Sequence, residues 1–189
     1  MLQNMHYFIA IPLSQDIKLW LSDIQNNLKS DKTLGYKSWT HQDDLHITLK
    51  FLGSVSTGTI DKLMEHLEKI NTISQFPLTI GGIGTFGNPN QPRVLWSGVS
   101  DSNSINSLYD AVEGICVALG FKEEKRPYRP HVTLAKKWSG QCIDIDSFQD
   151  DTFLEMKNFI VKHIVVYQIH PSDSPKYKVV KQIDLNRGE

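Results

Sequence analysis

Hydrophobic and polar residues alternate with a period of two along several short stretches of this chain, and follow helical spacing along three longer ones. A period of two predicts half-buried strands, and spacings of three and four predict amphipathic helices. We expect helices at residues 14–29, 56–70 and 104–119. We expect strands at residues 7–11, 37–39, 45–51, 76–83, 94–99, 159–169 and 177–183, and a further strand that begins at residue 131.

Proline and glycine mark where several of these elements end. Pro12 closes the first strand, Gly120 ends the third helix, and residues 88–92 form a turn between two strands. No linker divides the chain, and each half offers a strand, a helix and a further strand. We therefore expect an α+β arrangement over residues 1–189, as one domain of two related lobes with a cleft between them.

Two of the predicted strands contain nearly the same four-residue phrase. Residues 46–49 spell His-Ile-Thr-Leu, and residues 131–134 spell His-Val-Thr-Leu. Side chains two apart on a strand share a face, so each copy sets an imidazole beside a hydroxyl. In residues 45–51 every odd position is apolar. This pattern predicts that His46, Thr48 and Lys50 lie on the open face.

The repeated residues suit proton transfer at a phosphate. Histidine titrates near neutral pH, so one imidazole can accept a proton while a protonated partner donates one, each role contributing about 10²–10⁴-fold in rate. Thr48 and Thr133 can donate hydrogen bonds to phosphate oxygens. A single His-x-Thr string is more simply a half-buried histidine beside a threonine with strand propensity. Two copies in matching strands favour a catalytic pair, His46 and His131.

A basic stretch surrounds the second copy. Six lysines and arginines outweigh two glutamates between residues 122 and 137, and most of them fit a solvated surface. Lys136 is the exception, because it follows His131 by five residues and lies near the end of the same predicted strand. We expect its ammonium group to meet a phosphate as a point charge.

Two other chemistries fit the sequence less well. Residues 82–87 match the dinucleotide-binding fingerprint by letters, but that loop must open a helix, whereas a turn follows here. His41, Asp43, Asp44 and His46 are clustered, yet their spacing matches no zinc pattern. We therefore expect no bound metal and no cofactor.

Composition limits the kinds of partner and the cellular location that we expect for this protein. The chain has 189 residues, 40% of them hydrophobic, and a net charge of −1. This charge argues against coating of long nucleic acid but allows a nucleotide or an RNA end. Two cysteines make no disulfide framework, and Cys116 lies in an apolar helical pattern, so we expect a cytoplasmic protein. Neither a signal peptide, a membrane span nor an obligatory protein partner is evident.

The two phrases and their neighbours resemble the two-histidine (2H) phosphoesterase superfamily, whose signature is two His-x-Thr/Ser-x motifs. Within it, the chain is most similar to the RNA 2′,3′-cyclic phosphodiesterase family, also called the 2′-5′ RNA ligase family. The resemblance extends over nearly the whole chain and rests on residues 7–11, 45–53, 92–96 and 129–135.

This resemblance implies a bilobal α+β fold with pseudo-two-fold symmetry, antiparallel sheets lining a central cleft, and helices outside. It implies metal-free hydrolysis of an RNA or nucleotide 2′,3′-cyclic phosphate to a 2′-phosphate. His46 would donate a proton to the leaving 3′-oxygen, His131 would activate water, and Thr48 and Thr133 would hold the phosphate. The family often has arginine at the position of Lys136, and lysine keeps the charge but loses the bidentate fork.

Two alternatives remain open at this stage. One is a non-catalytic module that binds RNA ends or nucleotides in the same cleft. The other is joining of RNA ends through a 2′-5′ bond, which is the reverse reaction at the same site. Turnover of a cyclic nucleotide separates an enzyme from a binding module, and RNA halves are needed to detect ligation.

Overall fold

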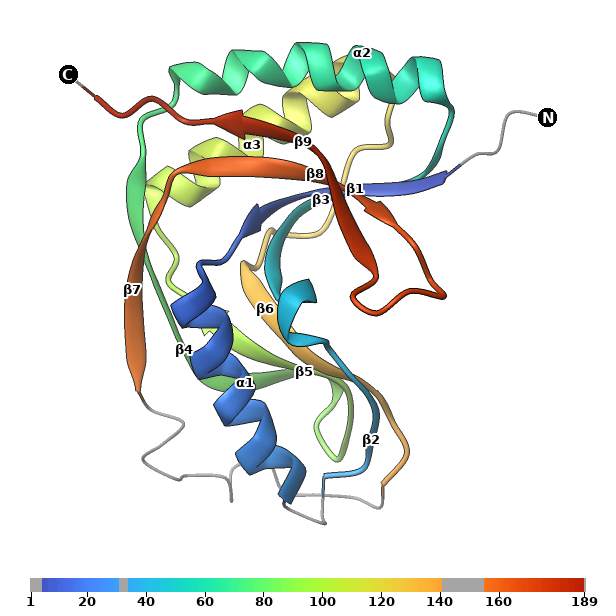
Figure 1. Ribbon diagram of the computed structural model, residues 1–189, viewed down its shortest axis with the longest axis vertical. Helices are drawn as coiled ribbons and strands as arrows, with labels where there is room; N and C mark the ends of the chain where they lie inside the picture. The colour runs from blue at the N-terminus through green and yellow to red at the C-terminus, as the bar shows by residue number, and fades with distance from the viewer. Residues whose placement is uncertain (1–4, 31–33, 141–154, 189) are drawn as a thin grey trace.

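The computed structural model describes residues 5–30, 34–140 and 155–188, and in this part three α-helices accompany a curled nine-stranded sheet (Figure 1). The predicted α+β class and antiparallel pairing are confirmed. The helices are α1 (Gln15–Ser30), α2 (Thr57–Leu67) and α3 (Asn103–Ala118). The strands are β1 (Met5–Pro12), β2 (Tyr36–Trp39), β3 (His46–Val55), β4 (Phe76–Asn88), β5 (Gln91–Val99), β6 (His131–Trp138), β7 (Met156–Val161), β8 (His163–Ile169) and β9 (Tyr177–Asp184).

The sheet consists of two halves that meet between β3 and β6. Its strand order is β7-β4-β5-β6-β3-β1-β8-β9, with β2 also paired to β6, and all of these pairs are antiparallel. One residue pair, Ile47 with Val132, joins β3 to β6. We call β3-β1-β8-β9 the first lobe and β2 with β6-β5-β4-β7 the second lobe, and the β3–β6 junction the seam.

The lobes do not coincide with the two halves of the sequence. β8 joins β1 in the first lobe, whereas β7 pairs with β4 at the far edge of the second lobe. The prediction of one long strand over residues 159–169 was therefore wrong. The chain leaves the sheet at Lys162 and re-enters it on the other lobe. The segments before and after Lys162 are both rich in apolar residues, so the hydrophobic pattern of the sequence does not reveal where β7 ends and β8 begins.

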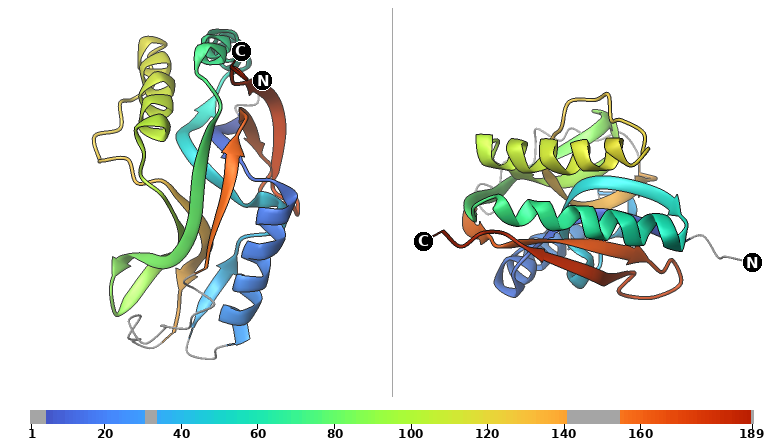
Figure 2. Two further views of the ribbon diagram at one scale, coloured as in Figure 1. Left: turned by 90° about the vertical axis from the view of Figure 1, so that its left-hand side faces the viewer. Right: turned by 90° about the horizontal axis from the view of Figure 1, so that it is seen from above.

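The helices cover one face of the sheet. One helix lies on the second lobe and two lie on the first lobe. α1 packs on the second lobe, where the side-chain amide of Gln25 donates to the carbonyl oxygens of Thr40 and Leu134, each at 2.9 Å. α2 and α3 lie side by side over the first lobe (Figure 2). The buried core is continuous between these layers. No helix among the described residues is long and apolar enough to cross a membrane.

The β4–β5 hairpin is longer than the sequence predicted. β4 continues through the glycine-rich residues 82–87, and only residues 89 and 90 form the turn. A Cβ atom at Gly84 would lie 2.2 Å from the indole of Trp96, so glycine is needed there for the ring to pack across the strand. A strand and not a helix follows this segment, which agrees with rejection of a dinucleotide-binding loop.

Candidate active site

The seam brings the two repeated phrases together. Because β3 and β6 are antiparallel about the Ile47–Val132 pair, His46 lies toward Thr133 and Thr48 lies toward His131. Ile47 and Val132 are fully buried, so the neighbouring histidines and threonines occupy the opposite, open face. Four of the five residues singled out in the sequence thus form one cluster.

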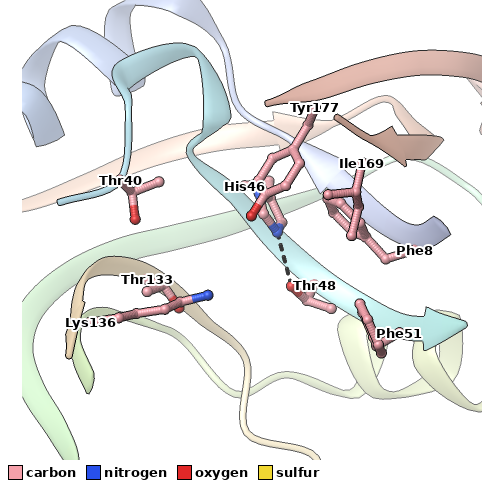
Figure 3. A pocket seen from close by; sticks show the side chains of 9 residues that line it. All are labelled: Phe8, Thr40, His46, Thr48, Phe51, Thr133, Lys136, Ile169 and Tyr177. Carbon is pink, nitrogen blue, oxygen red and sulfur yellow. Dashed lines mark hydrogen bonds between the residues drawn. The ribbon is translucent and has the colours of Figure 1, made fainter. Parts of the chain in front are cut away.

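Both imidazoles are oriented by the same backbone contact. Nδ1 of His46 lies 2.7 Å from the carbonyl oxygen of Asp44, and Nδ1 of His131 lies 2.7 Å from that of Arg129. A carbonyl oxygen only accepts, so each Nδ1 carries a hydrogen. Nε2 is therefore the atom that can gain or lose a proton in each ring. Nε2 of His46 lies 3.0 Å from the hydroxyl of Thr48 (Figure 3).

Aromatic rings enclose His46. The ring centroids of Phe8, Tyr167 and Tyr177 lie 4.7, 5.9 and 5.3 Å from that of the imidazole. Burial is the main reason that the pKa of His46 falls to about 4, and the positive charge of Lys136 adds to the effect. His46 is therefore neutral at pH 7 in the free protein.

His131 has a similar but less enclosed setting. The ring of Phe86 meets it edge-on, with centroids 4.9 Å apart. Burial also lowers the pKa of His131, and Lys136 contributes in the same direction. Each histidine thus has an aromatic neighbour from another strand of its own lobe, Phe8 of β1 for His46 and Phe86 of β4 for His131. Both histidines favour the uncharged state before a substrate binds.

These pKa shifts predict an acidic optimum for kcat/KM. The proton acceptor must be neutral and the donor charged, so activity falls below the pKa of the acceptor and above the pKa of the donor. Both values lie below 6.5 in the free protein, so we expect a bell-shaped kcat/KM profile with its maximum below pH 6.5. The kcat profile should peak at higher pH, because a bound phosphate anion raises both pKa values. A kcat/KM optimum above pH 7 would contradict this account.

A pocket of about 120 Å³ opens beside His46 (Figure 3). It is lined by Phe8, Thr40, His46, Thr48, Phe51, Thr133, Lys136, Ile169 and Tyr177. His131 is not one of the lining residues and adjoins the pocket across the seam. The sequence interpretation missed five lining residues, of which Phe51 had a signal, namely its place beside a His-x-Thr phrase. The others come from β1, from the residue that follows β2, and from β8 and β9, and no local pattern connects them with the seam.

A β-bulge at the same point of each repeat places Lys136 in this pocket. The register shifts at Leu49 against β1 and at Leu134 against β5. The extra residue reverses the alternation, so Lys136 lies on the open face with Thr133. In β3 the same shift buries Lys50 and exposes Phe51. The prediction that Lys50 lies on the open face and Phe51 on the buried face was therefore wrong.

Lys136 carries a cation that suits an anion in the pocket. Partial desolvation lowers its pKa, as does the nearby charge of Lys176. No ion pair to a carboxylate is recorded for it among the described residues. Lys137 differs, because its φ of +63° ends the extended alternation, and it does not line the pocket. The two adjacent lysines therefore form a matched pair for mutagenesis.

We expect Lys136→Ala to raise the KM of a cyclic nucleotide about 10–100-fold, the range for loss of one charge-assisted hydrogen bond. Lys137→Ala should change KM less than twofold. Steady-state kinetics on both variants check this prediction. Equal small effects would instead mean that Lys136 belongs to the solvated basic surface.

The acidic cluster near His46 is occupied by structural contacts. The buried carboxylate of Asp44 accepts hydrogen bonds from the backbone N–H groups of Lys176, at 2.9 and 3.0 Å, and Tyr177, at 3.1 Å. These bonds fix the β8–β9 loop next to His46. His41 turns its Nδ1 to the backbone N–H of Asp43. Within the described ranges, no three His, Cys, Asp or Glu side chains are grouped so as to hold a metal ion.

The chain is similar to one family model and to several curated proteins. A family model described as LigT like Phosphoesterase matches residues 11–96. The chain is 33% identical over 184 residues to the RNA 2′,3′-cyclic phosphodiesterase of Bacillus subtilis, which covers 96% of this chain and 97% of that protein. The chain belongs to the LigT-like phosphoesterase family. A family member from Geobacillus stearothermophilus, also named RNA 2′,3′-cyclic phosphodiesterase, is 34% identical over 189 residues, which are 97% of this chain and 58% of that protein.

Solved structures of LigT share the fold of this chain. The apo form of LigT from E. coli has a TM-score of 0.76 at 20% identity, covering 98% of this chain and 99% of that one. The same protein complexed with 3′-AMP has a TM-score of 0.75 at 21% identity, covering 97% and 99%. At such identities the likeness concerns the fold alone. It shows that the curled sheet of two lobes is the architecture of the LigT-like phosphoesterases.

Proposed function

We propose that this chain hydrolyses the 2′,3′-cyclic phosphate of an RNA end or nucleotide to a 2′-phosphate. The observation that carries the proposal is the seam, where two His-Thr pairs meet beside a pocket that also holds Lys136. The relatives from Bacillus and Geobacillus support this reaction by their names, and LigT complexed with 3′-AMP supports a nucleotide as ligand. Ligation and a purely binding role are not favoured by these relatives.

The proposed reaction uses the two histidines as base and acid. Nε2 of His131 takes a proton from water, whose oxygen forms a bond to phosphorus. The bond from phosphorus to the 3′-oxygen breaks, and Nε2 of His46 gives its proton to that oxygen. Thr48 and Thr133 donate hydrogen bonds to the non-bridging oxygens, and Lys136 neutralises their charge. Proton exchange with solvent then returns both imidazoles to their starting states.

His46 is neutral in the free protein, so it has to gain a proton before it can act as the acid. Substrate binding makes this protonation favourable. An anion within a few ångströms favours the charged form of an imidazole. A bound cyclic phosphate therefore raises the pKa of His46 from about 4 and lets the ring take up a proton from solvent. The site in this way becomes an acid only when a phosphate is present to be cleaved.

The product of a cyclic nucleotide tests the proposal. We expect adenosine 2′,3′-cyclic phosphate and an RNA with a cyclic end to yield 2′-phosphates, identified by phosphorus NMR, with EDTA present throughout. A predominant 3′-phosphate would mean that His131 is the proton donor and His46 the acceptor. Binding without turnover would favour the non-catalytic module, and joining of RNA halves would favour ligation. Loss of activity with EDTA, restored by zinc, would refute the metal-free mechanism.

We also propose that residues 1–189 act as one bilobal domain, without a cofactor, in the cytoplasm. A buried core that continues between the lobes supports the first point. Cys116 is a free thiol buried in that core, which suits a reducing compartment where RNA ends arise. Cys142 lies outside the described residues.

A further inference from the structure

The sheet joins the two His-Thr pairs at one point. β3 meets β6 through one residue pair, Ile47 with Val132, whereas β3 pairs with β1 along eight residue pairs. A single pair fixes where two strands touch but leaves their mutual tilt to other contacts. The distance between His46 and His131 therefore depends on what else ties the two lobes together beside the seam.

The loop that leads into β6 is tied to the first lobe through Tyr128. Residues 119–130 run from α3, over the first lobe, to β6 in the second lobe. Between residues 122 and 129 every side chain except that of Tyr128 is exposed. The hydroxyl of Tyr128 donates a hydrogen bond of 3.1 Å to the backbone carbonyl oxygen of Thr48 in β3. Its ring stacks on that of Tyr109 in α3, with centroids 4.0 Å apart and planes 9° from parallel.

Both ends of this hydrogen bond lie next to groups that orient the histidines. The hydroxyl of Thr48 lies 3.0 Å from Nε2 of His46 (Figure 3). Tyr128 is followed by Arg129, whose carbonyl oxygen lies 2.7 Å from Nδ1 of His131. Tyr128 thus connects the strand that carries the partner of one imidazole with the peptide group that orients the other.

We propose that Tyr128 is a positioning residue, whose hydroxyl ties the approach to His131 to β3 and thereby sets the distance between the Nε2 atoms of His46 and His131. The inference rests on the proposed function and adds a residue that does not line the pocket. In-line displacement needs the base and the acid on opposite sides of phosphorus at the same time. A displacement of about 1 Å from that geometry can cost about 10²-fold in rate.

Removal of one hydroxyl tests this role. Tyr128→Phe keeps the stacked ring, and we expect it to lower kcat on adenosine 2′,3′-cyclic phosphate about tenfold, because the histidines lose their fixed spacing. KM should stay within twofold of wild type, because no residue of the pocket is changed. Tyr109→Phe is the matched control, since it removes the hydroxyl of the other ring in the stack. No hydrogen bond of that hydroxyl is recorded in the described part of the chain, so kcat and KM should both stay within twofold.

Nitrogen-15 NMR of the imidazoles tests the inference without turnover. In the free wild-type protein, the backbone carbonyl at Nδ1 keeps neutral His131 in the tautomer with its hydrogen on Nδ1. We expect Tyr128→Phe to show both tautomers at His131, because that carbonyl belongs to the loosened end of the loop. The spectrum of His46 should not change, because its carbonyl partner, Asp44, lies outside the loop. Tyr109→Phe should match the wild type at both rings.

Three results would overturn the inference. The first is a kcat of Tyr128→Phe that equals that of the wild type or of Tyr109→Phe. The second is a loss that appears in KM alone, which would assign Tyr128 to substrate binding. The third is an unchanged tautomer of His131 in Tyr128→Phe. Absence of turnover in the wild type would instead refute the proposed function, and the NMR comparison of the free proteins would then decide the inference by itself.

Discussion

His46→Ala and His131→Ala should each lower kcat on a 2′,3′-cyclic nucleotide by about 10²–10⁴-fold, the usual contribution of one general acid or base. Both imidazoles lie on the open face of the seam, with Nδ1 bonded to a carbonyl and Nε2 available. Alanine removes the proton-transfer group but leaves the buried Ile47–Val132 pair that joins the lobes. Steady-state kinetics measure the loss.

A third histidine provides the matched control for these variants. His163 begins β8 opposite Asp184, at the far end of that strand from the pocket residue Ile169. His163→Ala should keep kcat within twofold of wild type. Circular dichroism should show that all three variants are folded. Near-wild-type turnover in a folded His46→Ala or His131→Ala protein would refute the two-histidine mechanism.

Lys50→Met should lower the free energy of unfolding by about 3–5 kcal/mol, the typical cost of leaving one partner of a buried ion pair alone. The Lys50 ammonium lies 2.7 Å from the carboxylate of Glu113 on α3, and these side chains are only 7% and 13% exposed. Nζ of Lys50 also donates to the carbonyl oxygen of Lys122, and Glu113 accepts from the N–H of Glu124. The network thus fixes the loop that leads into β6 and His131. Urea denaturation measures the change.

An exposed ion pair of the same length is the control for Lys50. Lys178 and Asp173 lie 2.7 Å apart, but their side chains are 57% and 40% exposed. Lys178→Met should change stability by less than about 1 kcal/mol, as is usual for surface pairs. Lys50→Met combined with Glu113→Met should recover part of the loss, because no unpaired charge stays buried. Equal costs for Lys50→Met and Lys178→Met would contradict a role for burial.

The local sequence pattern was sufficient to predict most helices and strands and the histidines and threonines of the seam. The helices begin and end within a few residues of their predicted bounds, with Ile17, Leu21, Ile24 and Leu28 buried on one face of α1. The spacing of apolar residues in helices, the residues that end helices and the alternation along strands all depend on neighbours along the chain. They can therefore be recognised in a single sequence. The two His-x-Thr phrases could be recognised for the same reason, because no tertiary information is needed to predict that residues two apart on a strand share a face.

The partners of those residues were decided only by tertiary structure. Nothing local shows that β7 and β8 separate at Lys162, because strand pairing is a contact between distant segments. The bulges at Leu49 and Leu134 likewise arise where one strand meets another, and each inserts an unpaired residue that a period of two does not reveal. They bury Lys50, expose Phe51 and turn Lys136 into the pocket. The sequence by itself determined which groups are available for chemistry, and the pairing of strands from distant parts of the chain decided which of them share one pocket.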